Sequence, residues 1–119
     1  MVSRSRVVRG RATQRLVAAW FAAHGWPYAY SKGAGESGID VMHMPGLAPE
    51  VKAVPGDNTG ALSQAVRNAG DALPFVVWRP NGYGPERIAD WPVFFRLSDA
   101  TRLLRAAGYG ETNTEGETK

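Results

Sequence analysis

Apolar residues near the start of this chain recur every three or four positions, which is the spacing of an amphipathic helix. Leu16 and Trp20 fall on one stripe of such a helix, within a segment from 10 to 24. Gly25 stands where a helix commonly ends in glycine, and Pro27 prevents the helix from continuing. The pattern therefore predicts a first helix over residues 10–24.

The rest of the chain alternates short apolar runs, typical of strands, with two more helical patterns. The expected strands cover residues 28–31, 39–44, 50–54, 73–79 and 91–97. One expected helix runs to residue 69 from a cap at Asp57 or Thr59, and the other runs from a cap at Ser98 to residue 107, where Gly108 ends it. This order predicts an α/β fold with a small central mixed sheet flanked by helices. The most apolar strand, 73–79, is expected at the centre of that sheet.

A chain of 119 residues has room for one domain. Its 44% hydrophobic and 21% charged residues form an ordinary globular composition, which excludes a wholly disordered chain. The two ends lack apolar spacing. We therefore expect a basic flexible arm over residues 1–9, a single domain over 10–110 and a disordered acidic tail over 111–119.

Charge is distributed unevenly, because the first fifteen residues carry five arginines and no acidic residue. These are Arg4, Arg6, Arg9, Arg11 and Arg15. A basic segment of this kind usually meets a polyanion, and nucleic acid is the commonest. The alternative is a solvated tail in a chain whose basic residues are mostly arginine.

The residue types that are rare or missing limit which catalytic and metal sites the chain can form. The chain has no cysteine and two histidines, which removes disulfides, thiolate catalysis and the common zinc sites. A metal would have to be held by carboxylates, which favours Mg²⁺ or Mn²⁺. No apolar run approaches the roughly 18 residues of a membrane helix. Since no cleavable leader follows Met1 either, we expect a cytoplasmic, DNA-associated protein without a membrane partner.

Three charged residues fall on two expected strands that otherwise look half-buried: Asp40 on the first, and Glu50 and Lys52 on the second. Side chains alternate along a strand, so Glu50 and Lys52 share a face. A hairpin centred near Gly46 would place Asp40 opposite Lys52 and Met42 opposite Glu50, so that the charged groups converge. Two carboxylates that close repel each other unless a cation lies between them. The pattern predicts a metal-dependent phosphodiesterase site. The alternative is an edge hairpin with a solvent-facing ion pair between Asp40 and Lys52.

Asp40 followed by Glu50-Val51-Lys52 resembles the motif of the PD-(D/E)XK nuclease superfamily, whose element order is also similar. The similarity is greatest to the archaeal-type Holliday junction resolvases, with the VRR-type nucleases next, and it covers about residues 10–80. The matching positions, in order, are Gly10-Arg11-Ala12-Thr13-Gln14-Arg15, His24-Gly25, Ser31, Gly35, Ser37, Asp40 and Glu50-Val51-Lys52. The resemblance implies a small restriction-endonuclease-like core.

The resemblance also implies roles for individual residues. Asp40 and Glu50 would bind the metal, the backbone carbonyl of Val51 would complete its protein ligands, and Lys52 would orient the attacking water or stabilise charge on the phosphate. The cofactor would be Mg²⁺, with Mn²⁺ able to substitute. The family commonly has glutamate where this chain has Gln14, and an amide brings no charge. This departure is consistent with one metal ion and puts a second in doubt. The alternative is that Gln14 is a polar residue at the start of the helix with no role in a site.

Further residues would support such a site. Gln64 on the second expected helix is similar to a polar residue that the superfamily often places beside its lysine, or else it is an exposed helix position. Ser31, Lys32 and Ser37 flank a glycine-rich loop over 32–38, where hydroxyl groups and amides would hold a phosphate. Three arginines are expected to contact the DNA backbone: Arg9, Arg11 and Arg15.

These features predict a Mg²⁺-dependent endodeoxyribonuclease that hydrolyses phosphodiester bonds in branched DNA, a Holliday junction resolvase of DNA recombination and repair. A four-way junction has two opposed strands to cut, and a two-fold homodimer supplies two sites of matching symmetry. The nearest alternative is a VRR-like nuclease that acts on flaps or forks. The alternative from another class is a non-catalytic DNA-binding module with a vestigial nuclease site, which Gln14 would suit.

Overall fold

A computed structural model describes residues 4–32, 38–53, 56 and 58–111, with side chains from Val8 onward. Its elements, in chain order, are α1 (Arg4–Ala23), β1 (Tyr30–Ser31), β2 (Val41–Met42), β3 (Leu47–Lys52), α2 (Asn58–Ala69), β4 (Leu73–Trp78), the 3-10 helix η1 (Pro85–Asp90), β5 (Val93–Phe94) and α3 (Leu97–Ala106). The predicted order of helices and strands is confirmed, with η1 added before the last strand.

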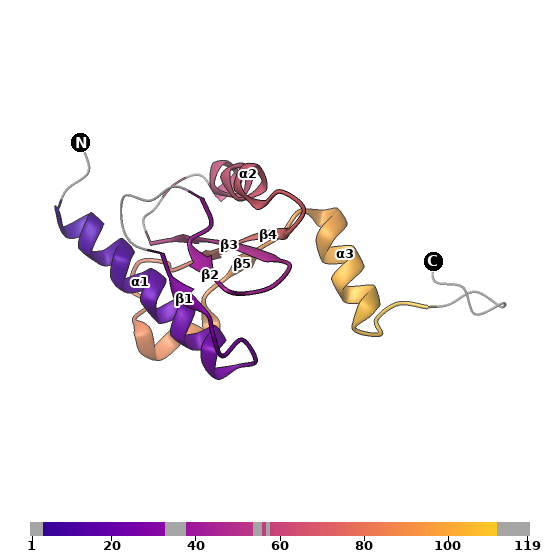
Figure 1. Ribbon diagram of the computed structural model, residues 1–119, viewed down its shortest axis with the longest axis horizontal. Helices are drawn as coiled ribbons and strands as arrows, with labels where there is room; N and C mark the ends of the chain where they lie inside the picture. Colours follow the sequence, from indigo (N-terminus) through magenta and orange to yellow (C-terminus); the bar gives the residue numbers. More distant parts are fainter. Residues whose placement is uncertain (1–3, 33–37, 54–55, 57, 112–119) are drawn as a thin grey trace.

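The central sheet is mixed and has the strand order β3-β4-β5 (Figure 1). β3 and β4 run parallel, in register from Leu47 beside Leu73 to Lys52 beside Trp78, and α2 makes the crossover between them. β5 pairs antiparallel with β4, while β1 and β2 form a separate antiparallel pair. The predicted α/β class is confirmed, and β4 is the central strand as its apolar run indicates.

Helices pack on both faces of this sheet. On one face, Val17 of α1 belongs to a buried cluster that also holds Val51, Phe75 and Val77. On the other face, Ala61 and Ala65 of α2 pack against Val76, whose exposed fraction is 0%. The alternation of β4 side chains accounts for this division, because Phe75 and Val77 point to the opposite face from Val76. Each side chain of β3 therefore points either to the face covered by α1, called the α1 face, or to the face covered by α2, called the α2 face.

The first helix begins earlier than its apolar stripe predicts. α1 starts at Arg4, six residues before the expected start, and ends at Ala23. Residues 4–9 of the expected arm therefore belong to α1, and residues 1–3 lie outside the described part. Three of the six residues from 4 to 9 are arginines, which have a high helix propensity, so this segment can extend the helix without apolar spacing.

The expected hairpin between 39–44 and 50–54 is wrong in its pairing. Met42 lies opposite Tyr30 of β1 rather than opposite Glu50, and β3 begins at Leu47, inside the expected turn. Pro49 is compatible with a strand here because the missing proline N–H would face the edge away from β4. The hydrogen bonding between β3 and its parallel partner β4 is therefore unaffected by Pro49.

The last helix is capped differently from the prediction. α3 begins at Leu97, its N-cap is Arg96, and that residue makes no side-chain capping hydrogen bond, so Ser98 is not the cap. Asp99 in the first turn instead pairs with Arg96 and Arg102. Gly108 follows with a φ of 98°, the left-handed conformation expected after a helix. No helix in the described ranges is both long and apolar enough to cross a membrane.

The packing predicts that Phe75→Ala destabilises the protein strongly. Phe75 is 4% exposed, and its ring contacts the rings of Phe21 and Phe95. Removing a buried phenyl group leaves a cavity, so we expect the free energy of unfolding to fall by about 3–5 kcal/mol in urea titrations. Tyr28→Ala is the control, because Tyr28 is 77% exposed and should change the value by less than about 0.5 kcal/mol. Equal effects of the two variants would contradict this core.

Candidate functional site

Asp40 lies along the edge of β3 that faces away from β4. Its N–H donates to the carbonyl of Pro49 at 3.2 Å, and its own carbonyl accepts from the N–H of Lys32 at 2.9 Å. Its carboxylate oxygen Oδ2 accepts a hydrogen bond of 2.8 Å from the N–H of Val51. Both the backbone and the side chain of Asp40 are therefore fixed against β3.

Glu50 and Lys52 share the α2 face of the sheet. Glu50 is in register with Val76, and neighbours in register on adjacent strands point to the same face. Lys52 lies two residues further along β3 and therefore points the same way. Its Nζ is 3.4 Å from Oε2 of Glu50. The predicted common face is confirmed, although the predicted hairpin is not.

The ion pair of Lys52 is formed with a buried partner. The Glu50 side chain is 4% exposed and that of Lys52 is 33% exposed. The structure therefore differs from the alternative of a solvent-facing pair between Asp40 and Lys52 across a hairpin. Burying a carboxylate is costly unless charges and hydrogen bonds compensate for the lost water. The burial of Glu50 is therefore unusual for a carboxylate that only contributes charge to the surface.

The two carboxyl groups act on each other. The pKa of Glu50 is raised to about 7: burial is the main cause, the nearby Asp40 carboxylate acts in the same direction, and Lys52 opposes both. Burial also raises the pKa of Asp40, while the Val51 N–H, Lys52 and Lys32 lower it. Asp40, Glu50 and Lys52 thus form one electrostatic cluster, here called the β3 cluster. A divalent cation between the two carboxyl groups would favour the ionised form of both.

The backbone of Val51 provides a further oxygen. The Lys52 carbonyl accepts from the N–H of Arg79 and so points toward β4. Peptide groups alternate along a strand, so the Val51 carbonyl points to the opposite edge, where the Val51 N–H meets Asp40. Two carboxylates and one carbonyl are the hard oxygen ligands that Mg²⁺ and Mn²⁺ prefer.

The donor set fits a divalent ion that keeps much of its water. In the ranges that the structure describes, no three His, Cys, Asp or Glu side chains gather into one group. Mg²⁺ is commonly held by one or two carboxylates and retains several waters, so a pair of carboxylates is sufficient. The residues that would hold it are Asp40, Glu50 and, through its carbonyl, Val51.

α2 fixes the segment that leads into Asp40. Nδ2 of Asn68 donates to the carbonyl of Gly38 at 3.3 Å. Gly38 has a φ of 99°, and a Cβ there would lie 3.0 Å from Nζ of Lys32. Glycine is therefore required by conformation, and a side chain would crowd the lysine. Asn68 was not among the predicted site residues, although its place four residues after Gln64, beside the buried alanine stripe of α2, was an available signal.

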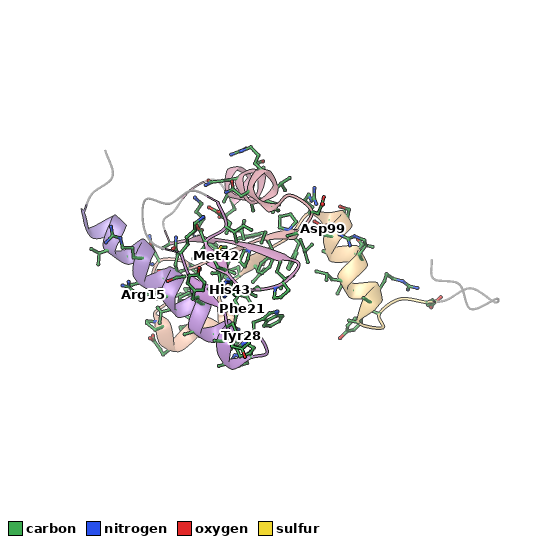
Figure 2. All side chains as sticks on the ribbon, viewed as in Figure 1. Arg15, Phe21, Tyr28, Met42, His43 and Asp99 are labelled. Atoms are coloured by element: carbon green, nitrogen blue, oxygen red, sulfur yellow. The ribbon has the colours of Figure 1, made fainter. Side chains whose placement is uncertain are left out.

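The remaining predicted residues divide into three groups. Gln14 and Gln64 are half-buried on α1 and α2, as are Ser31 and Lys32 beside the Asp40 segment. The three predicted arginines lie on α1, where Arg9 is half-buried and Arg11 and Arg15 are exposed. Arg15 lies across the molecule from Asp99 of α3 (Figure 2). Ser37 lies outside the described residues, as do residues 33–37 of the glycine-rich loop.

Three comparisons with known proteins bear on these residues. No family model, no curated protein and no solved structure matches this chain. Any function is therefore inferred from the geometry and charge of the β3 cluster.

The raised pKa of Glu50 predicts how stability depends on pH in the absence of metal. A group protonated more readily in the folded state stabilises the fold fully below its ordinary pKa of 4.5, and this contribution is lost as pH rises toward about 7. We expect Glu50→Gln to remove that loss. Between pH 4.5 and 8 the free energy of unfolding of the variant should therefore rise by about 3 kcal/mol relative to that of the wild type. Denaturant titrations in EDTA at several pH values measure the difference.

Glu86→Gln is the matched control, since Glu86 is an exposed carboxylate on η1. It should leave the pH profile of the wild type unchanged. Parallel profiles for Glu50→Gln and the wild type would show that Glu50 titrates normally, and the electrostatic description of the β3 cluster would then be wrong.

Proposed function

We propose that this protein is a metal-dependent endodeoxyribonuclease whose active site is the β3 cluster. One observation carries the proposal: a buried glutamate, a second carboxylate and a lysine lie together on one strand and its edge. Nζ of Lys52 is 3.4 Å from Glu50, and Asp40 is held by the N–H of Val51. The resemblance of Asp40 and Glu50-Val51-Lys52 to the PD-(D/E)XK motif supports the same assignment. A restriction-endonuclease-like core belongs to this proposal.

In the proposed mechanism each group has a separate task. A divalent cation, Mg²⁺ with Mn²⁺ as a substitute, supplies the positive charge that polarises a phosphodiester and eases deprotonation of water. Asp40 and Glu50 would hold this cation, and the low exposure of Glu50 would limit the screening of its charge by water. Lys52 offers an ammonium group to the negative charge that develops on the phosphate as the P–O bond to the leaving group breaks.

Branched DNA is the substrate that we propose, cut by a homodimer with Holliday junctions as its target. The support is the resemblance to junction resolvases and the basic surface of α1, where Arg11 and Arg15 are exposed. A two-fold dimer presents two active sites to the two opposed strands of a four-way junction. A VRR-like flap or fork nuclease would use the same site on a different DNA shape.

A non-catalytic DNA-binding module is the second candidate, and Gln14 is the observation that favours it. An amide at this position brings no negative charge for a metal. The burial of Glu50 argues against a vestigial site, because an unused carboxylate at 3% exposure destabilises the fold and has no reason to persist. The nuclease proposal is therefore preferred.

Substitutions in the β3 cluster test the activity. Asp40→Asn, Glu50→Gln and Lys52→Ala should each lower the rate of Mg²⁺-dependent cleavage by at least about 10²-fold, since each removes a charge that acts on the transition state. Asp71→Asn is the control, because Asp71 is an exposed carboxylate between α2 and β4. DNA binding in EDTA should persist in all four variants. Full activity of Asp40→Asn in Mg²⁺ would refute the assignment.

A panel of substrates separates the candidate functions. The wild type with Mg²⁺ is incubated with a four-way junction, a flap, a fork and a linear duplex of the same sequence. We expect paired nicks in the junction and slower cleavage of the other three. Preference for the flap or fork would favour the VRR-like alternative, and binding without cleavage of any substrate in Mg²⁺ or Mn²⁺ would favour the non-catalytic module.

A further inference from the structure

Two arginines from distant parts of the chain meet just beyond the end of β3. Nε of Arg9 on α1 donates to the carbonyl of Ala53 at 2.8 Å, one residue after Lys52. Arg79 directly follows β4, and its N–H donates to the carbonyl of Lys52 at 2.8 Å. Both residues are thus fixed to the segment that follows Glu50 and carries Lys52.

The guanidinium of Arg79 is held on several sides. Its Nη1 donates to Oγ1 of Thr13 at 3.1 Å, and Thr13 is 0% exposed. Its Nε donates to the carbonyl of Tyr83 at 2.9 Å, and its Cζ lies 5.3 Å from the centre of the Trp91 ring. A guanidinium held in this way loses little conformational entropy when it binds a further group.

The guanidinium of Arg9 retains an unused donor. Its Nη2 is buried and has no hydrogen-bond partner in the part of the chain that the structure describes. A buried donor without an acceptor costs free energy, and a charged one costs more. An oxygen-rich anion at this point would supply the missing acceptor.

Like charge is concentrated between the two arginines. Burial lowers the pKa of Arg79, the charge of Arg9 lowers it further, and the exposed carboxylate of Glu86 acts in the opposite direction. Two adjacent guanidinium groups repel each other in the free protein, and a bound anion would reverse that cost. Phosphate oxygens match the forked geometry of guanidinium donors.

We propose that Arg9 and Arg79 together bind one phosphodiester group of the DNA backbone, beside the phosphate that is cleaved at the β3 cluster. The proposal rests on the proposed function for the identity of the ligand, and it assigns a role to Arg79, which the sequence analysis did not single out. Glu50 and Lys52 point to the α2 face, whereas Arg9 comes from α1 on the other face. A strand of DNA bound at both places therefore crosses the end of β3, which fixes the position of the cleaved bond.

Salt-dependent DNA binding in EDTA, where no cleavage occurs, tests this site. Arg9→Gln and Arg79→Gln should each weaken binding of a four-way junction by roughly 10- to 100-fold, since each loses a charged hydrogen bond. Each should also reduce the slope of log affinity against log salt by about 1. The double variant should lose no more slope than either single variant, because both arginines are needed to hold the one phosphate that they share.

Arg105→Gln is the control with the same change of charge, located on α3. It should leave both affinity and slope close to the wild type. A fall of about 2 in the slope of the double variant would mean two separate phosphates and overturn the shared site. Unchanged slopes in both single variants would overturn the proposal altogether and leave the two arginines with a structural role.

Two further measurements keep the test decisive if Arg79→Gln does not fold. Arg79→Lys retains the charge but not the forked donors, so it should keep the slope near the wild type while losing affinity. Inorganic phosphate should raise the melting temperature of the wild type above that in chloride of equal ionic strength, and should do so less in Arg9→Gln. Stabilisation by phosphate without any effect of Arg9 on DNA affinity would indicate a small phosphate ligand and overturn the DNA assignment.

The outcome is separable from that of the proposed nuclease activity. A protein that shows this binding pattern and cleaves no substrate in Mg²⁺ or Mn²⁺ would contradict the nuclease and support the phosphate site. If the wild type cleaves branched DNA and the arginine variants keep the slope of the wild type, the nuclease would be supported and the phosphate site contradicted.

Discussion

A buried carboxylate, Glu50, is the constraint on which the site depends. It lies on the same face of the sheet as Val76, where α2 packs, and it is 3% exposed. The buried residues of α2 are all alanines, so this helix approaches the sheet closely and leaves little room for water around Glu50. Lys52 partly compensates the negative charge of Glu50, whereas the adjacent Asp40 carboxylate disfavours that charge and raises the pKa of Glu50. A pair of carboxylates in these surroundings is a strained arrangement in the metal-free protein, and a cation would relieve it.

β3 organises every group that the proposed function uses. One face carries Val51 into the core beneath α1, and the other carries Glu50 and Lys52 beneath α2. The edge away from β4 offers the Val51 peptide group to Asp40, and the far end offers the Ala53 carbonyl to Arg9. Because one strand sets all these directions, a shift of β3 by one residue would move Glu50 and Lys52 to the α1 face and dismantle the cluster.

The parts that could be predicted from sequence are those with a local cause. The apolar run of β4 indicates a central strand, and strand alternation places Glu50 and Lys52 on one face. The pairing of Asp40 could not be predicted, because Pro45, Gly46 and Pro49 suggest a long turn, whereas β3 already begins at Leu47. The contacts of Asn68 with Gly38 and of Arg79 with Thr13 span 30 and 66 residues. No local pattern encodes contacts of that range, so the partners of Asn68 and Arg79 were found only in the structure.

Charge explains why Gln14 is compatible with a working site in the proposed mechanism. Asp40 and Glu50 carry two negative charges when ionised, and Lys52 and Lys32 both lower the pKa of Asp40, so two positive charges already lie within reach of it. In the proposed mechanism a single divalent ion would offset the two negative charges of Asp40 and Glu50, which would suit the approach of an anionic phosphodiester. The resemblance implies a glutamate at position 14, whose negative charge would suit a second divalent ion, and Gln14 brings no charge. Within the proposed mechanism, these charges would suit hydrolysis assisted by one metal ion together with Lys52, rather than by two metal ions.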